Sequence, residues 1–119
     1  MPLPRFFGKR KKPNLLMARR VTGDSMFPTL RSGQLVIACG WVPNRVGDVV
    51  IIHHDSLDKV KRIERLRADG RVFVVGDNSA HSTDSRMFGW LASEQIVGRV
   101  IWPRLPRQIA IPPKPMEFR

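Results

Sequence analysis

Short apolar runs alternate along the chain with turn-forming residues such as Gly, Pro and Asp, a pattern typical of β-strands. The runs lie at residues 15–22, 34–38, 48–54, 59–66, 71–75 and 96–102. The run at 48–54 is rich in β-branched residues, which favours a buried strand. Ala68-Asp69-Gly70 is a hairpin turn signal. We therefore expect an all-β fold, a small antiparallel sandwich or open barrel.

Little helix is expected. Only residues 25–30 and 91–95 suggest short helical turns. In the run at 59–66 the apolar spacing slips at Arg62, which predicts a β-bulge or a helical turn. The alternation also implies that one of two neighbouring bases, Lys61 or Arg62, points with the buried face.

The positive charge of the chain is concentrated at its two ends. The formal net charge of +11 comes from 21 Lys and Arg against 10 Asp and Glu. Residues 1–20 carry seven bases and no acid, whereas residues 21–101 carry ten bases and nine acids. A nucleic-acid-binding domain usually carries its basic surplus on the folded surface, so the nearly neutral centre argues against nucleic acid. The single cysteine excludes an internal disulfide.

These shifts in composition divide the chain into three parts. We expect a basic N-terminal arm at 1–14, a folded domain at 15–102 and a Pro-rich basic tail at 103–119. Residues 1–12 suit a solvated tail or an anionic membrane surface. Because no apolar run is long enough for a spanning helix and no signal peptide is recognisable, we expect a cytoplasmic or peripherally membrane-associated protein.

A serine stands at the end of a predicted strand, in the stretch GDSMFPTL at residues 23–30. Gly23 allows another backbone to approach closely, and Ser25 can present its hydroxyl outside the sheet. The same residues also suit a helix N-cap, with Pro28 in the first turn. On these residues alone, both interpretations stay open.

The second motif is Val60-Lys61-Arg62-Ile63. Two bases on a strand usually face solvent. A lysine held in an apolar setting, however, has a lowered pKa, because burial disfavours its charged form. A neutral amine of that kind can act as a general base toward a hydroxyl.

The third motif is a polar loop from Gly76 to Gly89, GDNSAHSTDSRMFG. Such a loop can simply satisfy its own backbone. The spacing of Asp84 and Arg86 also allows an ion pair that fixes the loop, and Ser82 can orient a lysine amine through a hydrogen bond.

Together with Gly47-Asp48-Val49-Val50, and in this order along residues 21–100, the three motifs resemble the type I signal peptidase family of Ser–Lys proteases. The resemblance implies a serine endopeptidase that removes an N-terminal leader or signal peptide from a protein substrate. It also implies a preference for small residues before the cut and a reaction that requires no metal or organic cofactor.

The resemblance assigns roles residue by residue. Ser25 would be the nucleophile, Lys61 the general base and Ser82 the residue that hydrogen-bonds the lysine. The Ser25 backbone N–H would form part of the oxyanion hole. Some relatives add a serine hydroxyl at the position of Gly23, where here Gly23 itself or a water would substitute. The other positions would line the substrate pocket (Val21, Met26, Leu30 and Val60) or support the site (Arg62, Asp77, Asp84 and Arg86).

Two features depart from the usual signal peptidase. The chain has no membrane-spanning segment before the serine motif, and the gap from Lys61 to Gly76 holds a single hairpin in place of a large insertion. Both features resemble compact, anchor-free relatives such as the candidate maturation proteases for nickel-type superoxide dismutase. These two departures affect the expected identity of the substrate more than the expected catalytic mechanism.

Two other classes of protein share part of this pattern. Self-cleaving repressors of the DNA-damage response carry similar Gly-x-Ser-Met and Val-Lys-Arg elements, but they lack a box like the one at residues 76–89. A non-enzymatic basic β module would instead bind a membrane surface or nucleic acid through its arms. The repressors also need a cleavable region and usually a DNA-binding domain ahead of the protease, and weak binding with a steep salt dependence would support the binding module.

Overall fold

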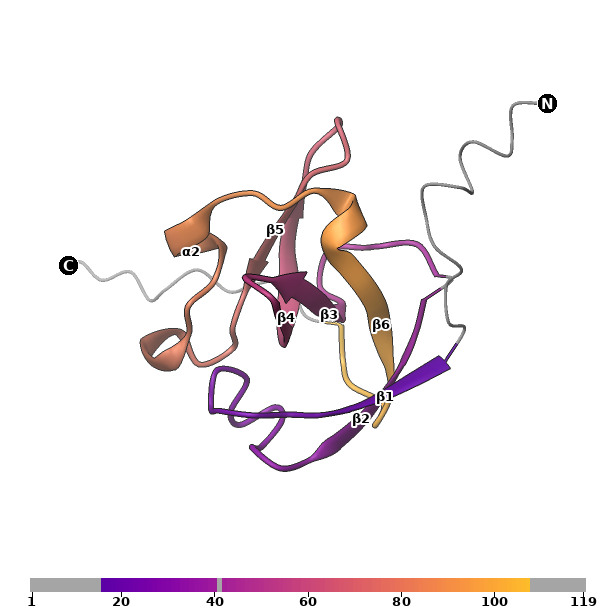
Figure 1. The fold of residues 1–119 in the computed structure, drawn as a ribbon, viewed down its shortest axis with the longest axis vertical. Coiled ribbons are helices and arrows are strands. Elements are labelled where there is room, and N and C mark those ends of the chain that lie inside the picture. Colours follow the sequence, from indigo (N-terminus) through magenta and orange to yellow (C-terminus); the bar gives the residue numbers. More distant parts are fainter. Residues whose placement is uncertain (1–15, 41, 108–119) are drawn as a thin grey trace.

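Six antiparallel strands form one open sheet in a computed structural model that describes residues 16–40 and 42–107 (Figure 1). The strand order across the sheet is β1-β2-β6-β3-β4-β5. The strands are β1 (Leu16–Arg20), β2 (Leu35–Cys39), β3 (Val49–His54), β4 (Leu57–Leu66), β5 (Val72–Val75) and β6 (Ile96–Trp102). The predicted all-β class is confirmed, and the sheet is not closed into a barrel.

The helical elements of the described residues are short and lie between β5 and β6 (Figure 1). They are η1 (Ser79–His81), α2 (Ser85–Phe88) and η2 (Ser93–Gln95). No helix in residues 16–40 and 42–107 is long and apolar enough to cross a membrane.

The central strand β3 carries the core on both of its faces. Val49 and Ile51 belong to one hydrophobic cluster, whereas Val50 and Ile52 belong to the other. Successive side chains of a strand point to opposite faces, so this split follows directly from the alternation. The predicted burial of this apolar run is confirmed, and a strand covered on both sides is the reason that the run is continuous.

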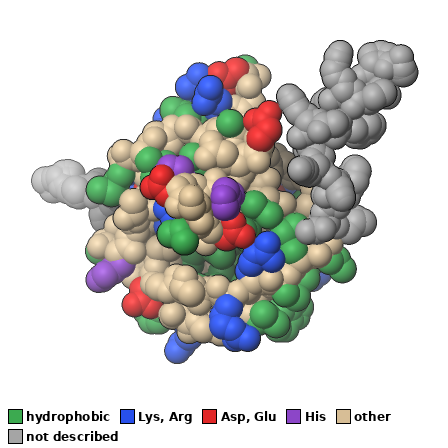
Figure 2. Space-filling model, in the orientation of Figure 1, with side chains coloured by type: hydrophobic (Ala, Val, Ile, Leu, Met, Phe, Trp, Pro, Cys, Tyr) green, Lys and Arg blue, Asp and Glu red, His purple; other side chains and the backbone are tan. Residues whose placement is uncertain are grey.

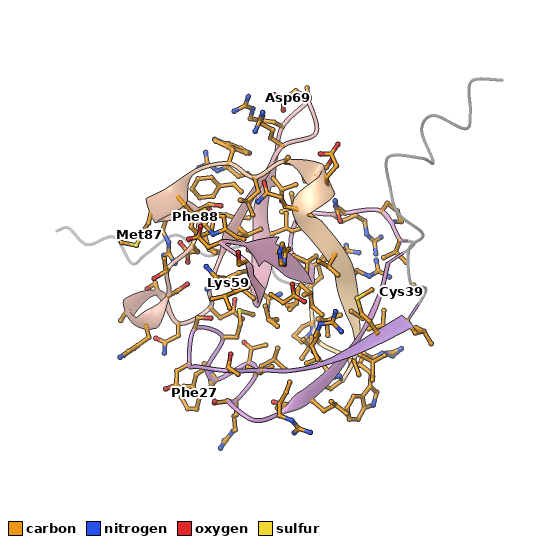
Figure 3. All side chains as sticks on the ribbon, viewed as in Figure 1. Phe27, Cys39, Lys59, Asp69, Met87 and Phe88 are labelled. Atoms are coloured by element: carbon orange, nitrogen blue, oxygen red, sulfur yellow. The ribbon has the colours of Figure 1, made fainter. Side chains whose placement is uncertain are left out.

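β4 contains a register shift two residues after Arg62, the position at which the sequence predicts an irregularity. Ile63 pairs with Val74 but Arg65 pairs with Phe73, so Glu64 is the extra residue of the shift. The hairpin that follows turns at the predicted residues, with the Gly70 N–H donating to the Arg67 carbonyl at 2.9 Å. Its tip, marked by Asp69, lies at the opposite end of the molecule from Phe27 (Figure 3).

Two local expectations were incomplete. The third motif, read from the sequence as a loop, contains η1 and α2, because the Asp84 side chain caps α2 by accepting from the Arg86 N–H. Strand β4 begins at Leu57, two residues earlier than expected. Asp55 and Ser56 both have positive φ, 56° and 64°, and form the tight turn that joins it to β3.

Residues 103–107, which the sequence assigns to the tail, pack against the body of the domain. Leu105 packs on the first core cluster, and the Pro106 carbonyl accepts a hydrogen bond from the Arg62 Nη1 at 3.1 Å. The predicted arm at 1–14 and the tail from 108 onward lie outside the described residues.

Candidate active site

A pocket of about 440 Å³ lies between the β1–β2 connection and β4. It brings Ser25 and Lys61 into one cavity, although 36 positions separate them in the chain. Figure 2 shows basic, acidic and histidine side chains gathered around a hollow on the face that Figure 1 presents. Ser25 is partly exposed there, so its hydroxyl is accessible to a ligand in the pocket.

Lys61 is buried in the middle of β4, with 3% of its surface exposed. Burial lowers the pKa of its amine below the usual 10.5, because the charged form is the more costly one to desolvate. The Asp84 carboxylate opposes this shift, whereas the positive charges of Lys59 and Arg86 add to it. The neutral amine is therefore populated at lower pH than in an exposed lysine.

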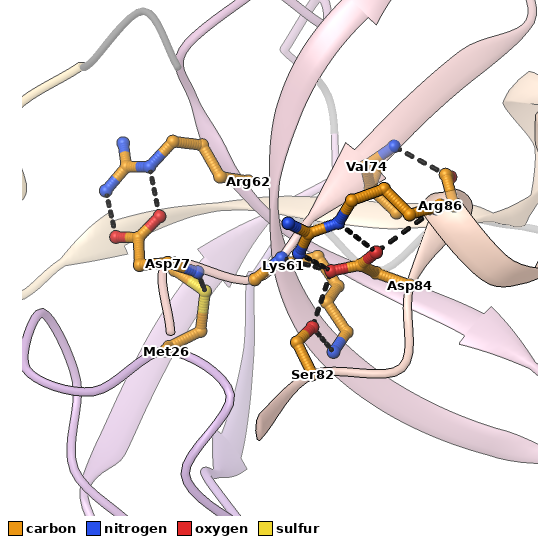
Figure 4. A network of polar contacts seen from close by, with 10 residues as sticks. Met26, Lys61, Arg62, Val74, Asp77, Ser82, Asp84 and Arg86 are labelled. Atoms are coloured by element: carbon orange, nitrogen blue, oxygen red, sulfur yellow. Dashed lines mark hydrogen bonds and ion pairs between the residues drawn. The ribbon is translucent and has the colours of Figure 1, made fainter. Parts of the chain in front are cut away.

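A chain of hydrogen bonds holds the lysine amine (Figure 4). The Lys61 Nζ donates to the Ser82 Oγ at 3.1 Å, and this hydroxyl donates to the Asp84 Oδ2 at 2.6 Å. Arg86 Nε donates to the Asp84 Oδ1 at 2.9 Å, and the Gly76 N–H donates to the Asp84 Oδ2 at 2.7 Å. With its carboxylate fully satisfied, Asp84 fixes the direction of Ser82.

The ionisation of Asp84 follows from the same contacts. Burial by itself would raise the pKa of the carboxyl, but the hydrogen bonds from Arg86, Ser82 and the Gly76 N–H outweigh it and lower the pKa to about 2. Asp84 is therefore a fixed negative charge at all but strongly acidic pH.

A second network ties the lysine strand to the serine loop. Arg62 is 1% exposed and makes two parallel hydrogen bonds of 2.8 Å to the Asp77 carboxylate (Figure 4). Burial opposes the ionisation of Asp77, but the Arg62 and Thr29 hydrogen bonds outweigh it and lower the pKa of the carboxyl. The Thr29 Oγ1 donates to the same carboxylate, so Asp77 links β4 to the segment that carries Ser25. One of the two bases was expected to be buried; both are, because both faces of β4 are covered at this point.

The backbone of the third motif also contacts Ser25 directly. The Asn78 N–H donates to the Ser25 carbonyl at 2.7 Å, and the Asn78 side chain donates to the Asp24 carbonyl at 3.0 Å. Gly76 permits this approach, because a Cβ there would lie 2.6 Å from the Ser25 carbonyl oxygen and would overlap the Ser82 hydroxyl. A glycine is thus required where the serine loop and the third motif meet.

The Gly23 backbone has a partner of its own. Its N–H donates to the Ser32 Oγ at 3.2 Å, and Gly23 also lines the pocket, so its part in the oxyanion hole stays a prediction. Gly23 adopts a φ of +83°, a conformation that suits glycine.

Three of the four residues assigned to the substrate pocket line the cavity: Val21, Met26 and Val60. Leu30 instead lies fully buried in the first core cluster and does not line it. The sequence missed much of the polar rim, including Arg19, Arg20, Asp58, Lys59, His81 and Thr83. These residues come from β1, β4 and the third motif, and only the tertiary fold brings the three segments together at one pocket.

Comparison with known proteins gives one family. The family model described as signal peptidase, peptidase S26, matches residues 67–105. The chain is 32% identical to the mitochondrial inner membrane protease subunit 1 of Schizosaccharomyces pombe, in an alignment that covers 75% of each chain. It is 25% identical to the probable signal peptidase I-1 of Synechocystis sp., covering 71% of this chain and 68% of the relative. It is 28% identical to signal peptidase I of Bacillus caldolyticus, covering 70% and 78% respectively.

The all-β body and its pocket therefore belong to a peptidase of the signal peptidase type. The chain is a member of the signal peptidase family, peptidase S26.

Proposed function

We propose that this chain is a serine endopeptidase in which Ser25 and Lys61 form a catalytic dyad, carried by a domain spanning residues 15–102. Its substrate is a protein with a cleavable N-terminal leader or signal peptide. The observation that carries this proposal is the shared pocket, which is lined both by a partly exposed serine and by a buried lysine whose amine is held by Ser82.

The reaction requires a neutral amine. Lys61 accepts the proton of the Ser25 hydroxyl while the Ser25 Oγ forms a bond to the scissile carbonyl carbon. The Ser25 backbone N–H stabilises the oxyanion. Lys61 then gives its proton to the leaving amine as the carbon–nitrogen bond breaks. Water attacks the acyl-enzyme carbonyl carbon while its proton passes to Lys61. The bond between that carbon and the Ser25 Oγ then breaks, and Lys61 returns the proton to the Ser25 Oγ, which restores the free serine and the neutral amine.

The wall of the pocket supports a preference for small apolar residues before the cut. Val21, Met26 and Ile51 are nearly or fully buried and form part of its apolar lining, together with Val60 and Leu57. Large substrate side chains would have to displace these packed residues, at a cost typical of overpacking in a core.

Cleavage of a synthetic leader peptide tests the proposal. The parent chain should cleave before the residue that follows an Ala-x-Ala sequence, whereas Ser25→Ala and Lys61→Met should be inactive with circular dichroism spectra like that of the parent. Lys61→Arg should also be inactive, because a guanidinium stays charged. Ser93→Ala, at an exposed serine of η2, is the matched control and should retain parental activity. Cleavage by Ser25→Ala at the parental rate would exclude the dyad.

A further inference from the structure

A second cavity lies beside the beginning of β3 and shares no lining residue with the active-site pocket. Its volume is about 270 Å³. Four arginines and one acid supply its charged groups: Arg45, Arg99, Arg104, Arg107 and Asp48. The formal charge of this lining is +3, in a domain whose central residues 21–101 are nearly neutral.

The carboxylate at the centre of this cavity is incompletely paired. Asp48 is 8% exposed, and its Oδ1 accepts from the Arg107 Nε at 3.3 Å. The Nε of Arg45 and the Nη1 of Arg99 each lie 3.6 Å from its Oδ2, close enough for attraction but too far for a hydrogen bond. Within residues 16–40 and 42–107, the buried Oδ2 has no hydrogen-bond partner.

The wall of the cavity is held in place by the protein itself. Arg62 Nη1 donates both to the Gly47 carbonyl at 2.7 Å and to the Pro106 carbonyl at 3.1 Å. Leu105 packs on the first core cluster. Together with the Pro106 contact, this packing fixes the segment that carries Arg104 and Arg107 to the body of the domain. The backbone beside the cavity is therefore fixed, and the exposed side chains of Arg45, Arg104 and Arg107 line the cavity with Arg99.

The surplus positive charge of this cavity and its unpaired carboxylate oxygen both indicate the same kind of ligand. The guanidinium groups carry N–H donors and surplus positive charge, which match an oxyanion. The Asp48 Oδ2 is a buried acceptor that needs a donor, and an unsatisfied buried acceptor is costly. An oxyanion that retains an O–H group satisfies both, as hydrogen phosphate does; sulfate at neutral pH has no such proton.

We propose that this arginine-lined cavity is a binding site for a protonated phosphate group, either free hydrogen phosphate or the phosphomonoester of a lipid headgroup. The ligand oxygens accept from the arginines, and its P–OH donates to the Asp48 Oδ2. The site is separate from the proposed peptidase chemistry, and its occupancy is measured without any cleavage assay.

Isothermal titration with inorganic phosphate and with sulfate, at matched ionic strength and neutral pH, tests this assignment. Phosphate should bind at least about tenfold more tightly than sulfate, since a hydrogen bond to a charged group corresponds to a factor of that order. The double variant Arg99→Gln, Arg107→Gln should lose phosphate binding. The double variant Arg67→Gln, Arg71→Gln, at the distant hairpin, removes the same charge and should bind as the parent does. Equal affinity for both anions, or phosphate affinity unchanged in the double variant, would overturn the proposal.

Asp48→Asn gives a second test that does not depend on losing charge attraction. The amide removes the negative charge, so sulfate should bind more tightly than it binds the parent. The neutral amide oxygen is a weaker acceptor than the carboxylate, so the preference for phosphate should shrink. A preference of parental size in Asp48→Asn would exclude the proposed hydrogen bond. Thermal unfolding of each variant in buffer identifies the variants that are folded. If Asp48→Asn is unfolded, phosphate binding by the double arginine variant provides the test of the site.

Vesicles distinguish the two sources of the phosphate group. Vesicles with phosphatidate that compete with inorganic phosphate, while phosphatidylglycerol vesicles do not, would assign a lipid phosphomonoester. Phosphate binding that neither vesicle displaces would assign the free ion. Absence of binding to inorganic phosphate and to phosphatidate alike would contradict the site.

Discussion

The Nζ of Lys61 donates to the Oγ of Ser82 at 3.1 Å, and the hydroxyl in turn donates to Asp84. Because the hydroxyl proton is directed to the carboxylate, an oxygen lone pair of Ser82 is left to accept from the lysine. One N–H of the amine is thus fixed in direction, and the rest of the amine is oriented within the pocket that also contains Ser25.

Ser82→Ala should lower kcat by about 10²-fold, because the general base loses the contact that orients it. KM should change little, since Ser82 does not line the pocket. Ser82→Thr keeps the hydroxyl and should recover part of the activity. Ser79→Ala, at an exposed serine three positions earlier, serves as the control. A parental kcat in Ser82→Ala would remove Ser82 from the positioning role.

Gly76→Ala should reduce both stability and activity. The new Cβ would overlap the Ser82 hydroxyl and press on the Ser25 carbonyl, so both residues must move. We expect a loss of about 1–3 kcal/mol in the free energy of unfolding, measured with urea, and a fall in kcat. Gly70→Ala, at the hairpin turn where φ is +93°, introduces backbone strain far from the site. It should lose stability but keep its kcat; a parental kcat in Gly76→Ala would show that this close approach has no part in the chemistry.

Arg62→Gln should destabilise the fold strongly. It leaves the partly buried Asp77 carboxylate without its bidentate partner and frees the Gly47 and Pro106 carbonyls. Breaking a buried ion pair on one side costs about 3–5 kcal/mol, which urea unfolding resolves. Arg67→Gln at the exposed hairpin should leave the unfolding midpoint near that of the parent. Similar midpoints for the two variants would contradict a structural role of Arg62.

Much of the fold could be predicted from local sequence. The β-branched run at 49–52 identifies the central strand, and Asp69-Gly70 identifies the hairpin. The helix α2 was missed because Asp84 was interpreted only as a partner of Arg86, although an acid before Ser85 is also a good N-cap. Propensity alone could not place the β4 start, which depends on two non-glycine residues with positive φ.

The candidate site was predictable where its residues stand in motifs and unpredictable where tertiary contacts build it. Ser25, Lys61 and Ser82 were named from the sequence, and the structure brings the first two into one pocket and the last two into a hydrogen bond. Leu30 was assigned to the pocket from resemblance, but packing takes it into the core. The Thr29 link to Asp77 joins residues 48 positions apart and has no local signal.

The charge of Asp84 should make stability depend on acid. Its pKa is about 2 in the folded protein and near 3.8 when unfolded, so the unfolded state binds more protons between these values. The stabilisation is complete above about pH 4 and is lost as the pH falls toward about 2. It amounts to about 2 kcal/mol, and the difference in free energy of unfolding between the parent and Asp84→Asn should shrink by that amount over this range. A difference that does not vary with pH would contradict the assigned ionisation.

The most direct test of the account is the pKa of Lys61 itself, measured by carbon-13 NMR of labelled lysine and compared with the pH dependence of kcat/KM for leader-peptide cleavage. We expect the amine to titrate below 10.5, the usual lysine value, because burial disfavours its charge. Activity should rise with pH through that same midpoint, since only the neutral amine accepts the Ser25 proton. Cleavage at full rate over a pH range in which Lys61 stays protonated would contradict the dyad.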